Sequence, residues 1–269
     1  MKKILVSLLI VGVLSLVLSQ TVYARPSSQQ SGTTVSVGAT PIPHAELLNL
    51  IRGDLSAQGI TLRVVEFTDY VQPNAALING DLDANYFQHL PYLESNPEWS
   101  ARLAPAFGVH VEPFGLYSVK YNSIAALPNG ASIAIPNDPS NGGRALLLLQ
   151  ANGLITLRAG AGLSATPRDV VGNPKNFRFQ ELEAAQLPRS LQDVDAAAIN
   201  GNYALEAGFN PVRDSLIIEG GQSPYVNYVV VQKGKENDPG IIALKNALLS
   251  QKVKDYILSS YDGGVLAVF

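Results

Sequence analysis

The sequence predicts an α/β fold in which parallel sheets carry helices on both faces. Short runs of β-branched and apolar residues alternate with segments of helical spacing over roughly 230 residues, the pattern of parallel strands joined by crossover helices. The 269 residues are 46% hydrophobic and only 15% charged, so the chain can bury a substantial core and is too apolar to be disordered. One large domain and two smaller ones are both compatible with this length.

The first predicted unit is a strand, a helix and a second strand. Val35 and Val37 alternate into a strand, which the Thr40-Pro-Ile-Pro-His44 segment ends. Apolar residues between Leu47 and Leu55 have helical spacing, and Gly59 ends that helix. Residues 62–67 then form the second strand. The segment before this unit, residues 25–33, is rich in Ser, Gln and Gly and is predicted to be a flexible linker.

The same alternation continues to the end of the chain. Predicted strands lie at residues 82–84, 103–111, 116–121, 132–136, 154–157, 177–182, 194–199, 215–218 and 226–232. Predicted helices lie at residues 73–79 and 87–94, after Gly143 as far as Gln150, after Thr166, near 184–192 with an interruption at Pro188, and as a C-terminal pair that opens at Asp238-Pro239.

The most informative stretch is residues 132–150, a buried strand, a polar turn and an apolar helix. Gly142 and Gly143 would leave the first-turn amides of this helix uncovered, and Arg144 adds a fork of donors that matches a carboxylate. We therefore expect an anion site here. The alternative is an ordinary capped helix with a solvated arginine. The turn contains four residues of the types that cap helices, Asn137, Asp138, Ser140 and Asn141.

The first 24 residues have the composition of a secretory signal peptide. Lys2 and Lys3 precede the apolar run Ile4–Leu18, and Val22-Tyr-Ala24 is a small-residue cleavage site. A retained membrane anchor is the alternative, although the run is short of the ~20 residues that a spanning helix needs. Cleavage would change the formal net charge from −3 to −5, so a nucleic-acid partner is not expected.

The composition argues against several kinds of active site. The chain has no cysteine, which excludes a disulfide scaffold, a thiolate metal site and a cysteine nucleophile. It has three histidines and none of the common hydrolase, phosphate-loop or zinc-protease motifs. We therefore predict neither an enzyme nor a bound cofactor or metal.

Five stretches together resemble the methionine-binding lipoproteins of the NlpA family, which serve ABC importers. They are residues 132–150, Asp83-Ala-Asn-Tyr-Phe-Gln-His-Leu-Pro-Tyr92, Asp195-Ala-Ala-Ala-Ile-Asn-Gly-Asn-Tyr203, Ser223-Pro-Tyr-Val-Asn227 and Tyr261-Asp-Gly-Gly264. They span about residues 34–269 in the order of the family. The chain departs from that family in lacking a lipobox cysteine. We therefore expect a periplasmic or extracytoplasmic protein that is freely soluble or tethered by other means.

The resemblance implies a two-lobed periplasmic-binding-protein fold of the type II kind, with the ligand between the lobes. On that basis residues 34–117 and 231–269 form the first lobe, and residues 118–230 form the second. Periodicity alone does not predict this division.

The resemblance also assigns roles to polar residues. A free amino acid presents a carboxylate, an ammonium and a side chain. Arg144 and the turn that contains Asn141 would bind the carboxylate. The family motifs place acceptors for the ammonium at Asn200 and Asn227, with Asn202 as a weaker candidate. Outside the family context an asparagine at the end of a strand is usually a turn former.

The side-chain pocket is expected to be aromatic, because sulfur makes favourable contacts with ring edges. The candidates are Tyr70, Phe87, His89 and Tyr92. The alternative is that these residues are core, since Phe87 and Tyr92 fall in a predicted short amphipathic helix. His44 and His110 match no ligand position and are predicted to be structural.

These inferences together predict a monomeric solute-binding protein that captures L- or D-methionine, or a close analogue, and delivers it to an ABC transporter permease. A short methionine-containing peptide or another apolar amino acid is the alternative ligand. An enzyme on the same two-lobed fold and a surface adhesin are the alternatives from other classes.

Overall fold

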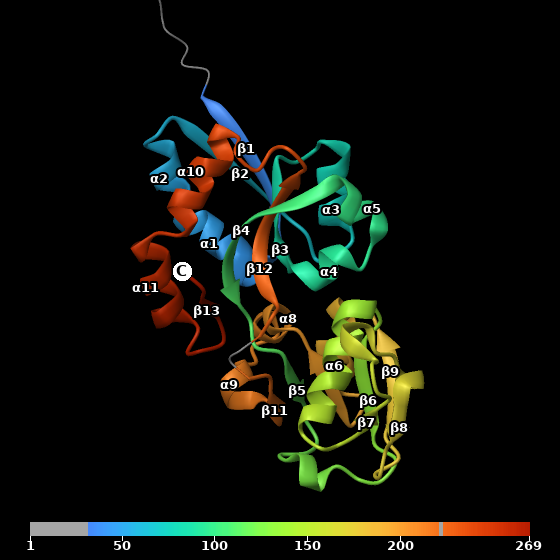
Figure 1. The fold of residues 1–269 in the computed structure, drawn as a ribbon. Coiled ribbons are helices and arrows are strands. Elements are labelled where there is room, and N and C mark those ends of the chain that lie inside the picture. Colours follow the sequence, from blue (N-terminus) through green and yellow to red (C-terminus); the bar gives the residue numbers. More distant parts are fainter. Residues whose placement is uncertain (1–31, 221–222) are drawn as a thin grey trace, which may run out of the picture. The chain divides into compact units, whose positions relative to one another are not determined.

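Two mixed β-sheets organise the computed structural model, which describes residues 32–220 and 223–269 (Figure 1). The first sheet has six strands in the order β13-β4-β12-β3-β1-β2. Their bounds are β1 Thr33–Ala39, β2 Ile60–Glu66, β3 Ala84–His89, β4 Leu103–Val111, β12 Val226–Gln232 and β13 Leu266–Ala267.

The second sheet has five strands in the order β11-β5-β10-β6-β9. Their bounds are β5 Gly115–Tyr117, β6 Ser132–Pro136, β9 Arg178–Leu182, β10 Ala196–Ile199 and β11 Ile217–Ile218. A separate antiparallel pair joins β7 (Thr156–Leu157) and β8 (Val170–Gly172).

The predicted α/β class holds, but the sheets contain antiparallel strands beside the predicted parallel ones. In the first sheet β1 is parallel to β2 and β3, whereas β12 is antiparallel to both β3 and β4. In the second sheet β6 is parallel to β9 and β10, whereas β5 is antiparallel to β10 and β11. The antiparallel strands β5 and β12 occur where the chain passes between the sheets, since β4 leads directly to β5 and β12 follows β11 back into the first sheet, whereas the antiparallel β13 is the last strand of the chain. A chain that leaves a sheet and returns to it in this way adds strands of the opposite direction.

The helices are short and mostly follow the predicted positions. They are α1 Glu46–Leu50, α2 Arg52–Ser56, α3 Gln72–Asn79, α4 Leu90–Glu94, α5 Pro97–Arg102, α6 Pro139–Ala151, α7 Leu187–Ser190, α8 Gly201–Glu206, α9 Pro211–Asp214, α10 Pro239–Leu248 and α11 Gln251–Ser260. Helical turns lie at Pro41–Ala45, Ile124–Ala126, Gly162–Ser164, Pro167–Asp169 and Ala184–Gln186. The predicted helix after Thr166 is only such a turn, closed by a capping box between Thr166 and Asp169.

Each sheet buries apolar side chains on both faces, as the α/β prediction requires. In β12, Val229 and Val231 belong to one buried cluster and Val230, between them, to another. In β10, Ala198 and Ile199 likewise belong to different clusters. Successive side chains of a strand point to opposite faces, so both sheets are covered on both sides.

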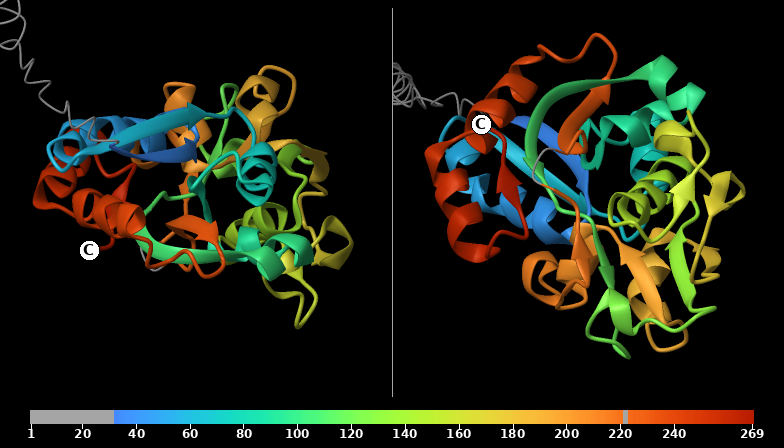
Figure 2. Two further views of the ribbon diagram at one scale, coloured as in Figure 1. Left: turned by 90° about the horizontal axis from the view of Figure 1, so that it is seen from above. Right: turned by 60° about the horizontal axis from the view of Figure 1, so that its bottom comes forward.

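The two C-terminal helices pack against the first sheet. Leu244 and Leu248 of α10 and Ile257 of α11 share a buried cluster with Val37 of β1 and Leu47 of α1. Figure 2 shows α10 and α11 beside the N-terminal elements in both views. The division into lobes stays a prediction. Strand β12, which the predicted boundary at residue 230 would divide, lies entirely in the first sheet.

One element differs from its prediction in a way that matters for the site. Residues 87–94 were expected to be helical, but Ala84–His89 form the fully buried strand β3 between β1 and β12, and the helix begins only at Leu90. The side chain of His89 caps this helix by accepting the backbone N–H of Tyr92. The buried cross-strand partners therefore outweigh the local helical spacing.

The predicted signal peptide (residues 1–24) and most of the predicted linker (residues 25–33) lie outside the described residues. Within the described part of the chain, no helix has the length and hydropathy needed to cross a membrane.

Candidate functional site

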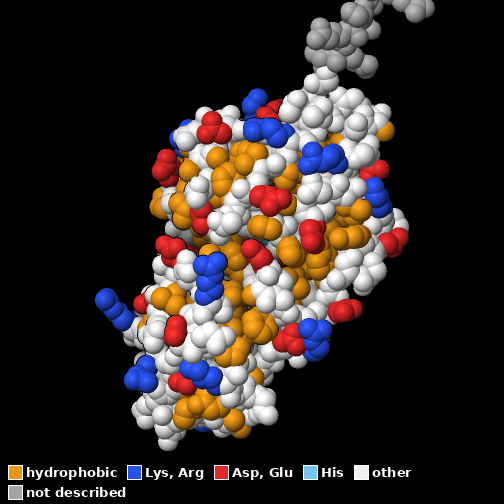
Figure 3. All heavy atoms as spheres, turned by 180° about the vertical axis from the view of Figure 1, so that it is seen from behind, with side chains coloured by type: hydrophobic (Ala, Val, Ile, Leu, Met, Phe, Trp, Pro, Cys, Tyr) orange, Lys and Arg blue, Asp and Glu red, His pale blue; other side chains and the backbone are white. Residues whose placement is uncertain are grey.

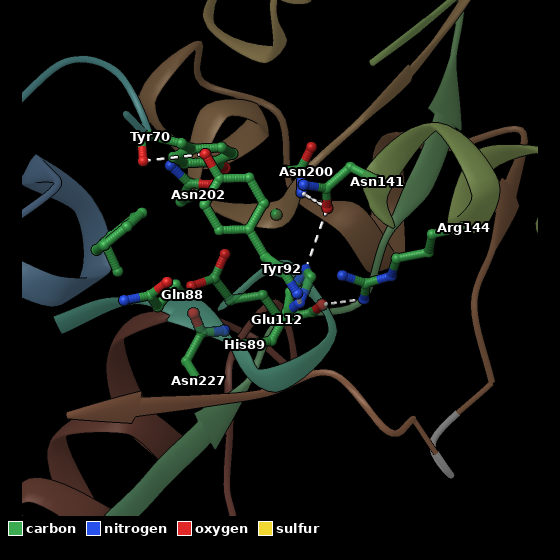
Figure 4. Close-up of a pocket in the computed structure, with 12 residues that line it drawn as sticks. Tyr70, Gln88, His89, Tyr92, Glu112, Asn141, Arg144, Asn200, Asn202 and Asn227 are labelled. Atoms are coloured by element: carbon green, nitrogen blue, oxygen red, sulfur yellow. Dashed lines mark hydrogen bonds between the residues drawn. The ribbon is translucent and has the colours of Figure 1, made fainter. Parts of the chain in front are cut away.

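A pocket with about 330 Å³ of free space is lined by residues from both sheets (Figure 4). All nine residues singled out from the sequence line it. The complete lining is Tyr70, Phe87, Gln88, His89, Tyr92, Glu112, Asn141, Arg144, Asn200, Gly201, Asn202 and Asn227.

The first sheet places its contributions at the ends of strands. Phe87 and His89 lie at the end of β3, and Asn227 pairs with His89 at the start of β12. Glu112 directly follows β4. Because these ends are neighbours in the sheet, residues more than a hundred positions apart reach one pocket.

The second sheet contributes through two helix starts. Asn141 and Arg144 are three residues apart on α6 and therefore lie on the same side of the helix. Asn200 ends β10 and precedes α8, which carries Gly201 and Asn202.

The two glycines at the start of α6 do not have the predicted role. The carboxylate of Asp138 caps the helix and accepts the backbone N–H of Asn141 at 2.9 Å. A Cβ on Gly142 would lie 2.8 Å from the carbonyl oxygen of Pro136, and one on Gly143 would lie 2.1 Å from that of Leu163. The glycines therefore let the helix approach neighbouring backbone.

Polar contacts join the two sides of the pocket. The Oδ1 atom of Asn141 accepts the Nε2–H of His89 at 3.1 Å and the Nδ2–H of Asn200 at 2.8 Å. The Tyr70 hydroxyl donates to Oδ1 of Asn202 at 2.6 Å. Figure 4 shows these side chains converging from opposite sides of the pocket.

Arg144 is buried and tightly held. Its Nε donates to Oε1 of Glu219 at 3.0 Å, and its Nη2 donates to Oε2 of Glu219 and to the carbonyl oxygen of Glu112. Its Cζ lies 4.0 Å from the ring centroid of Tyr225 and 5.0 Å from that of Phe114. The alternative prediction, an ordinary capped helix with a solvated Arg144, is therefore wrong for this side chain. Glu219 was not anticipated from the sequence.

The aromatic residues form a continuous wall. The ring of Tyr70 lies 5.8 Å from that of Phe87, 5.7 Å from Tyr92 and 4.9 Å from Tyr203, measured between centroids. Their hydroxyl groups are occupied: Tyr92 donates to the carbonyl oxygen of Tyr70, and Tyr203 donates to that of Thr68. The wall thus presents mainly ring surface, which suits an apolar or thioether side chain.

His89 is neutral in this setting. Burial lowers the pKa of its imidazole to about 3, and the charge of Arg144 acts in the same direction. With Nε2 donating to Asn141 and Nδ1 accepting from the Tyr92 backbone, both ring nitrogens are satisfied within the protein. His89 thus acts as a bridge between the two sides of the pocket.

Glu112 is the main pocket residue that the sequence reading missed, together with Gln88 and Gly201. Burial alone raises the pKa of Glu112, but His44, His110 and the backbone N–H of Asn202 lower that pKa by more, so the carboxyl group is ionised. Its position after a buried strand and before Pro113 was the available signal. His44 and His110, predicted to be structural, both contact it.

Two buried amide atoms in the pocket have no hydrogen-bond partner among the described residues: Oδ1 of Asn200 and Nδ2 of Asn202. Unpaired buried polar atoms are costly, so native structures rarely leave them without a partner. One is an acceptor and the other a donor, so the site is prepared for a ligand that carries both kinds of group.

A family model described as NlpA lipoprotein matches residues 35–269. The chain belongs to this family. It is 46% identical over 241 residues to the membrane lipoprotein TpN32 of Treponema pallidum, which covers 89% of this chain and 90% of that protein. It is 40% identical to the methionine-binding lipoprotein MetQ of Bacillus subtilis, covering 87% of this chain and 88% of the relative.

Solved structures of similar proteins have the same fold as this chain. A nutrient-binding protein of Burkholderia cenocepacia bound to methionine is 44% identical and superposes with a TM-score of 0.84, covering 87% of this chain and all of that one. The methionine-binding protein MetQ superposes with a TM-score of 0.82 at 38% identity, covering 87% of this chain and 97% of that one. The chain therefore has the two-lobed fold of the periplasmic binding proteins.

These relatives correct the predicted localisation. A periplasmic or extracytoplasmic protein, secreted through a cleaved signal peptide and either freely soluble or tethered by other means, was expected because the chain has no lipobox cysteine. This expectation is contradicted by the NlpA relatives, which are named membrane lipoprotein, outer membrane lipoprotein and methionine-binding lipoprotein.

Proposed function

We propose that this chain is the solute-binding component of an ABC importer and that its ligand is methionine. The observation that carries the proposal is the composition of the pocket. Charged and amide groups at Glu112, Arg144, Asn200 and Asn202 adjoin an aromatic wall that includes Tyr70. This combination matches an amino acid with a charged α-carbon end and an apolar side chain. The relative bound to methionine and the relatives named as methionine-binding support the same ligand.

In this proposal Arg144 and the Nδ2 atom of Asn202 bind the ligand carboxylate, because both are donors. Glu112 and the Oδ1 atom of Asn200 bind the ammonium, because both are acceptors. The role proposed for Asn227 differs from the ammonium acceptor expected from the sequence. Its Oδ1 already interacts with Nε2 of His44 at 3.2 Å, so it offers its amide N–H groups to the ligand.

The transporter partner follows from the family rather than from the pocket. One structural neighbour is named as the periplasmic substrate-binding protein of an ABC transporter from Coxiella burnetii, at 43% identity and a TM-score of 0.82. Delivery to a permease by a monomer is proposed on this basis. Charges of both signs are interspersed on the face shown in Figure 3, and the net charge is negative, which suits neither DNA nor RNA.

The closed pocket and the named relatives favour this function over its alternatives. Contacts such as that between His89 and Asn141 close the pocket across its two sides, which leaves little room for a methionine-containing peptide. Relatives of this chain are named as methionine-binding proteins, and one was solved with methionine bound, so we propose binding without chemistry.

Two measurements test the proposal. A native mass spectrum of protein purified without refolding is expected to show a co-purified ligand with the mass of methionine. Calorimetry after ligand removal is expected to show binding of one methionine per chain, with L- and D-methionine compared directly. Binding of another amino acid with methionine excluded would overturn the ligand assignment.

A further inference from the structure

Glu112 is held by two histidines that lie outside the pocket lining. Its Oε1 atom is 2.8 Å from Nε2 of His110 and 3.3 Å from Nε2 of His44. All three side chains are buried, with residue exposures of 5% for Glu112, 1% for His44 and 0% for His110. One oxygen of this buried carboxylate faces two ring nitrogens. Such an arrangement destabilises the fold unless those nitrogens carry the hydrogens.

A hydroxyl group behind each ring decides where those hydrogens lie. Oγ1 of Thr40 is 2.8 Å from Nδ1 of His44, and the hydroxyl of Tyr86 contacts Nδ1 of His110. Neither hydroxyl has another hydrogen-bond acceptor among the described residues. Each hydroxyl therefore donates to its ring, so each Nδ1 is an acceptor and each Nε2 carries the hydrogen. His110 then donates to Glu112. The Nε2–H of His44 donates to Oδ1 of Asn227, and this nitrogen also lies 3.3 Å from Oε1 of Glu112.

The same geometry would also admit a metal ion, since the three candidate ligand atoms lie within 4.8 Å of one another. A metal on the two Nε2 atoms would require a hydrogen on both Nδ1 atoms. The hydroxyls of Thr40 and Tyr86 would then become acceptors, and their own hydrogens would lose the only partners they have in the described structure. The hydrogen bonds of Thr40 and Tyr86 therefore favour a network without a metal ion.

The carboxylate retains a position for one more donor. An ionised carboxylate has about four acceptor positions. The Nε2–H of His110 and the backbone N–H of Asn202 occupy two of them, and Nε2 of His44, 3.3 Å from Oε1, lies against a third. Gly201 lets the carboxylate reach the pocket, because a Cβ there would lie 2.6 Å from the Cβ of Glu112 and 3.1 Å from its Oε2.

We propose that Thr40–His44 and Tyr86–His110 are two positioning pairs that orient Glu112 as the receptor for the ligand α-ammonium group, and that they determine the preference for ligands that carry a free amine. The pairs touch Glu112 and not the ligand. This proposal rests on the proposed function in one respect, namely that the ligand is an α-amino acid.

The experiment compares two ligands in parent and variant proteins by calorimetry. The ligands are L-methionine and its desamino analogue, which keeps the carboxylate and thioether but lacks the amine. Glu112→Gln is expected to weaken methionine binding at least tenfold and to change binding of the analogue less than threefold. Tyr86→Phe, which removes one hydroxyl, is expected to weaken methionine binding about twofold to tenfold and to leave the analogue unchanged.

A matched control separates positioning from general packing. Tyr117 is also fully buried, lies outside the pocket lining, and its hydroxyl has no partner among the described residues. Tyr117→Phe is expected to bind both ligands as the parent does. Equal loss of both ligands in Tyr86→Phe, or no loss of methionine binding, would overturn the positioning role.

A spectroscopic measurement on the parent protein tests the tautomers directly. Nitrogen NMR of the histidine rings is expected to show His44 and His110 neutral with the hydrogen on Nε2, and unchanged by equimolar zinc. The opposite tautomer, or a stoichiometric change on adding zinc, would overturn the network. Failure of the parent to bind methionine would instead overturn the proposed function, a result that the ring spectra distinguish because they need no ligand.

Discussion

The guanidinium group of Arg144 is paired side-on with the carboxylate of Glu219, with Nε 3.0 Å from Oε1. The side chain of Arg144 is 5% exposed and that of Glu219 is 18% exposed, so the pair is largely shielded from water. The contact fixes the plane of the guanidinium above the ring of Tyr225. Since the hydrogen bonds of Arg144 within the described structure use Nε and Nη2, the pairing directs Nη1 to a ligand carboxylate in the proposed site.

Replacing Arg144 is therefore expected to reduce ligand affinity. Arg144→Ala removes a charge-assisted hydrogen bond worth about 1.5–3 kcal/mol, so methionine affinity should fall more than tenfold. Arg144→Lys should recover only part of the loss because lysine lacks the planar fork that engages Glu219. Arg158→Ala is the matched control, since Arg158 is 65% exposed and pairs with Asp169 far from the pocket lining. Calorimetry that finds parental affinity in Arg144→Ala would contradict the assignment.

Stability is expected to fall in mild acid. Burial lowers the pKa of His44 to about 4 and that of His89 to about 3, whereas both are near 6.5 in an unfolded chain. Between about pH 6.5 and pH 4 the unfolded state therefore binds protons that the folded state does not. Stability should be complete above pH 6.5 and decline as pH falls, by up to about 1.4 kcal/mol per pH unit for each histidine.

Urea denaturation at pH 7.5, 6 and 5 measures this dependence. His89→Gln should lower the slope between pH 6 and pH 5 by about one proton, because it removes one of the two imidazoles whose pKa is lowered. A midpoint that does not change over this range would show that the imidazoles are accessible to protons in the folded state.

The aromatic wall is expected to select ligands by polarity more than by shape. Norleucine, which replaces the sulfur with a methylene, should lose only the sulfur–aromatic contribution of about 1 kcal/mol, less than tenfold in affinity. Glutamate would bury a second charge against the rings of Tyr70 and Phe87 and should bind at least a hundredfold more weakly. Competition against labelled methionine measures both. Equal competition by glutamate and norleucine would mean that these rings do not contact the ligand side chain.

The close approach at Gly143 predicts a stability effect that two glycine substitutions separate. Gly143→Ala would bring a Cβ to 2.1 Å from the carbonyl oxygen of Leu163, so we expect destabilisation of about 1–3 kcal/mol or more. Gly53→Ala, in the helix α2, meets no atom within 4 Å and should stabilise the protein by about 0.5–1 kcal/mol. Thermal unfolding compares the two. If both variants gain stability, the packing of α6 against Leu163 is incorrect.

The sequence by itself determined the order of the elements and the residue types of the site. Strong local signals were sufficient for β6 and α6, where an apolar strand, a proline and a capping residue follow one another. Nine candidate residues indicated by the sequence line the pocket. Eight of them lie in contiguous motifs, including Asn200 directly after β10 and Asn227 near the start of β12, whereas Tyr70 lies outside those motifs.

Only the tertiary structure decided the strand directions, the conformation of residues 87–89 and the partners of the charged groups. Local spacing favoured a helix at Phe87, but burial between β1 and β12 made it a strand. His110 lies only two residues before Glu112, but His44 and Glu219 come from distant segments, and nothing in the spacing of His44 and His110 predicts a shared carboxylate. Local sequence sets propensities and caps over a few residues, whereas a buried charge is stabilised by whichever groups the fold brings within about 3 Å of it.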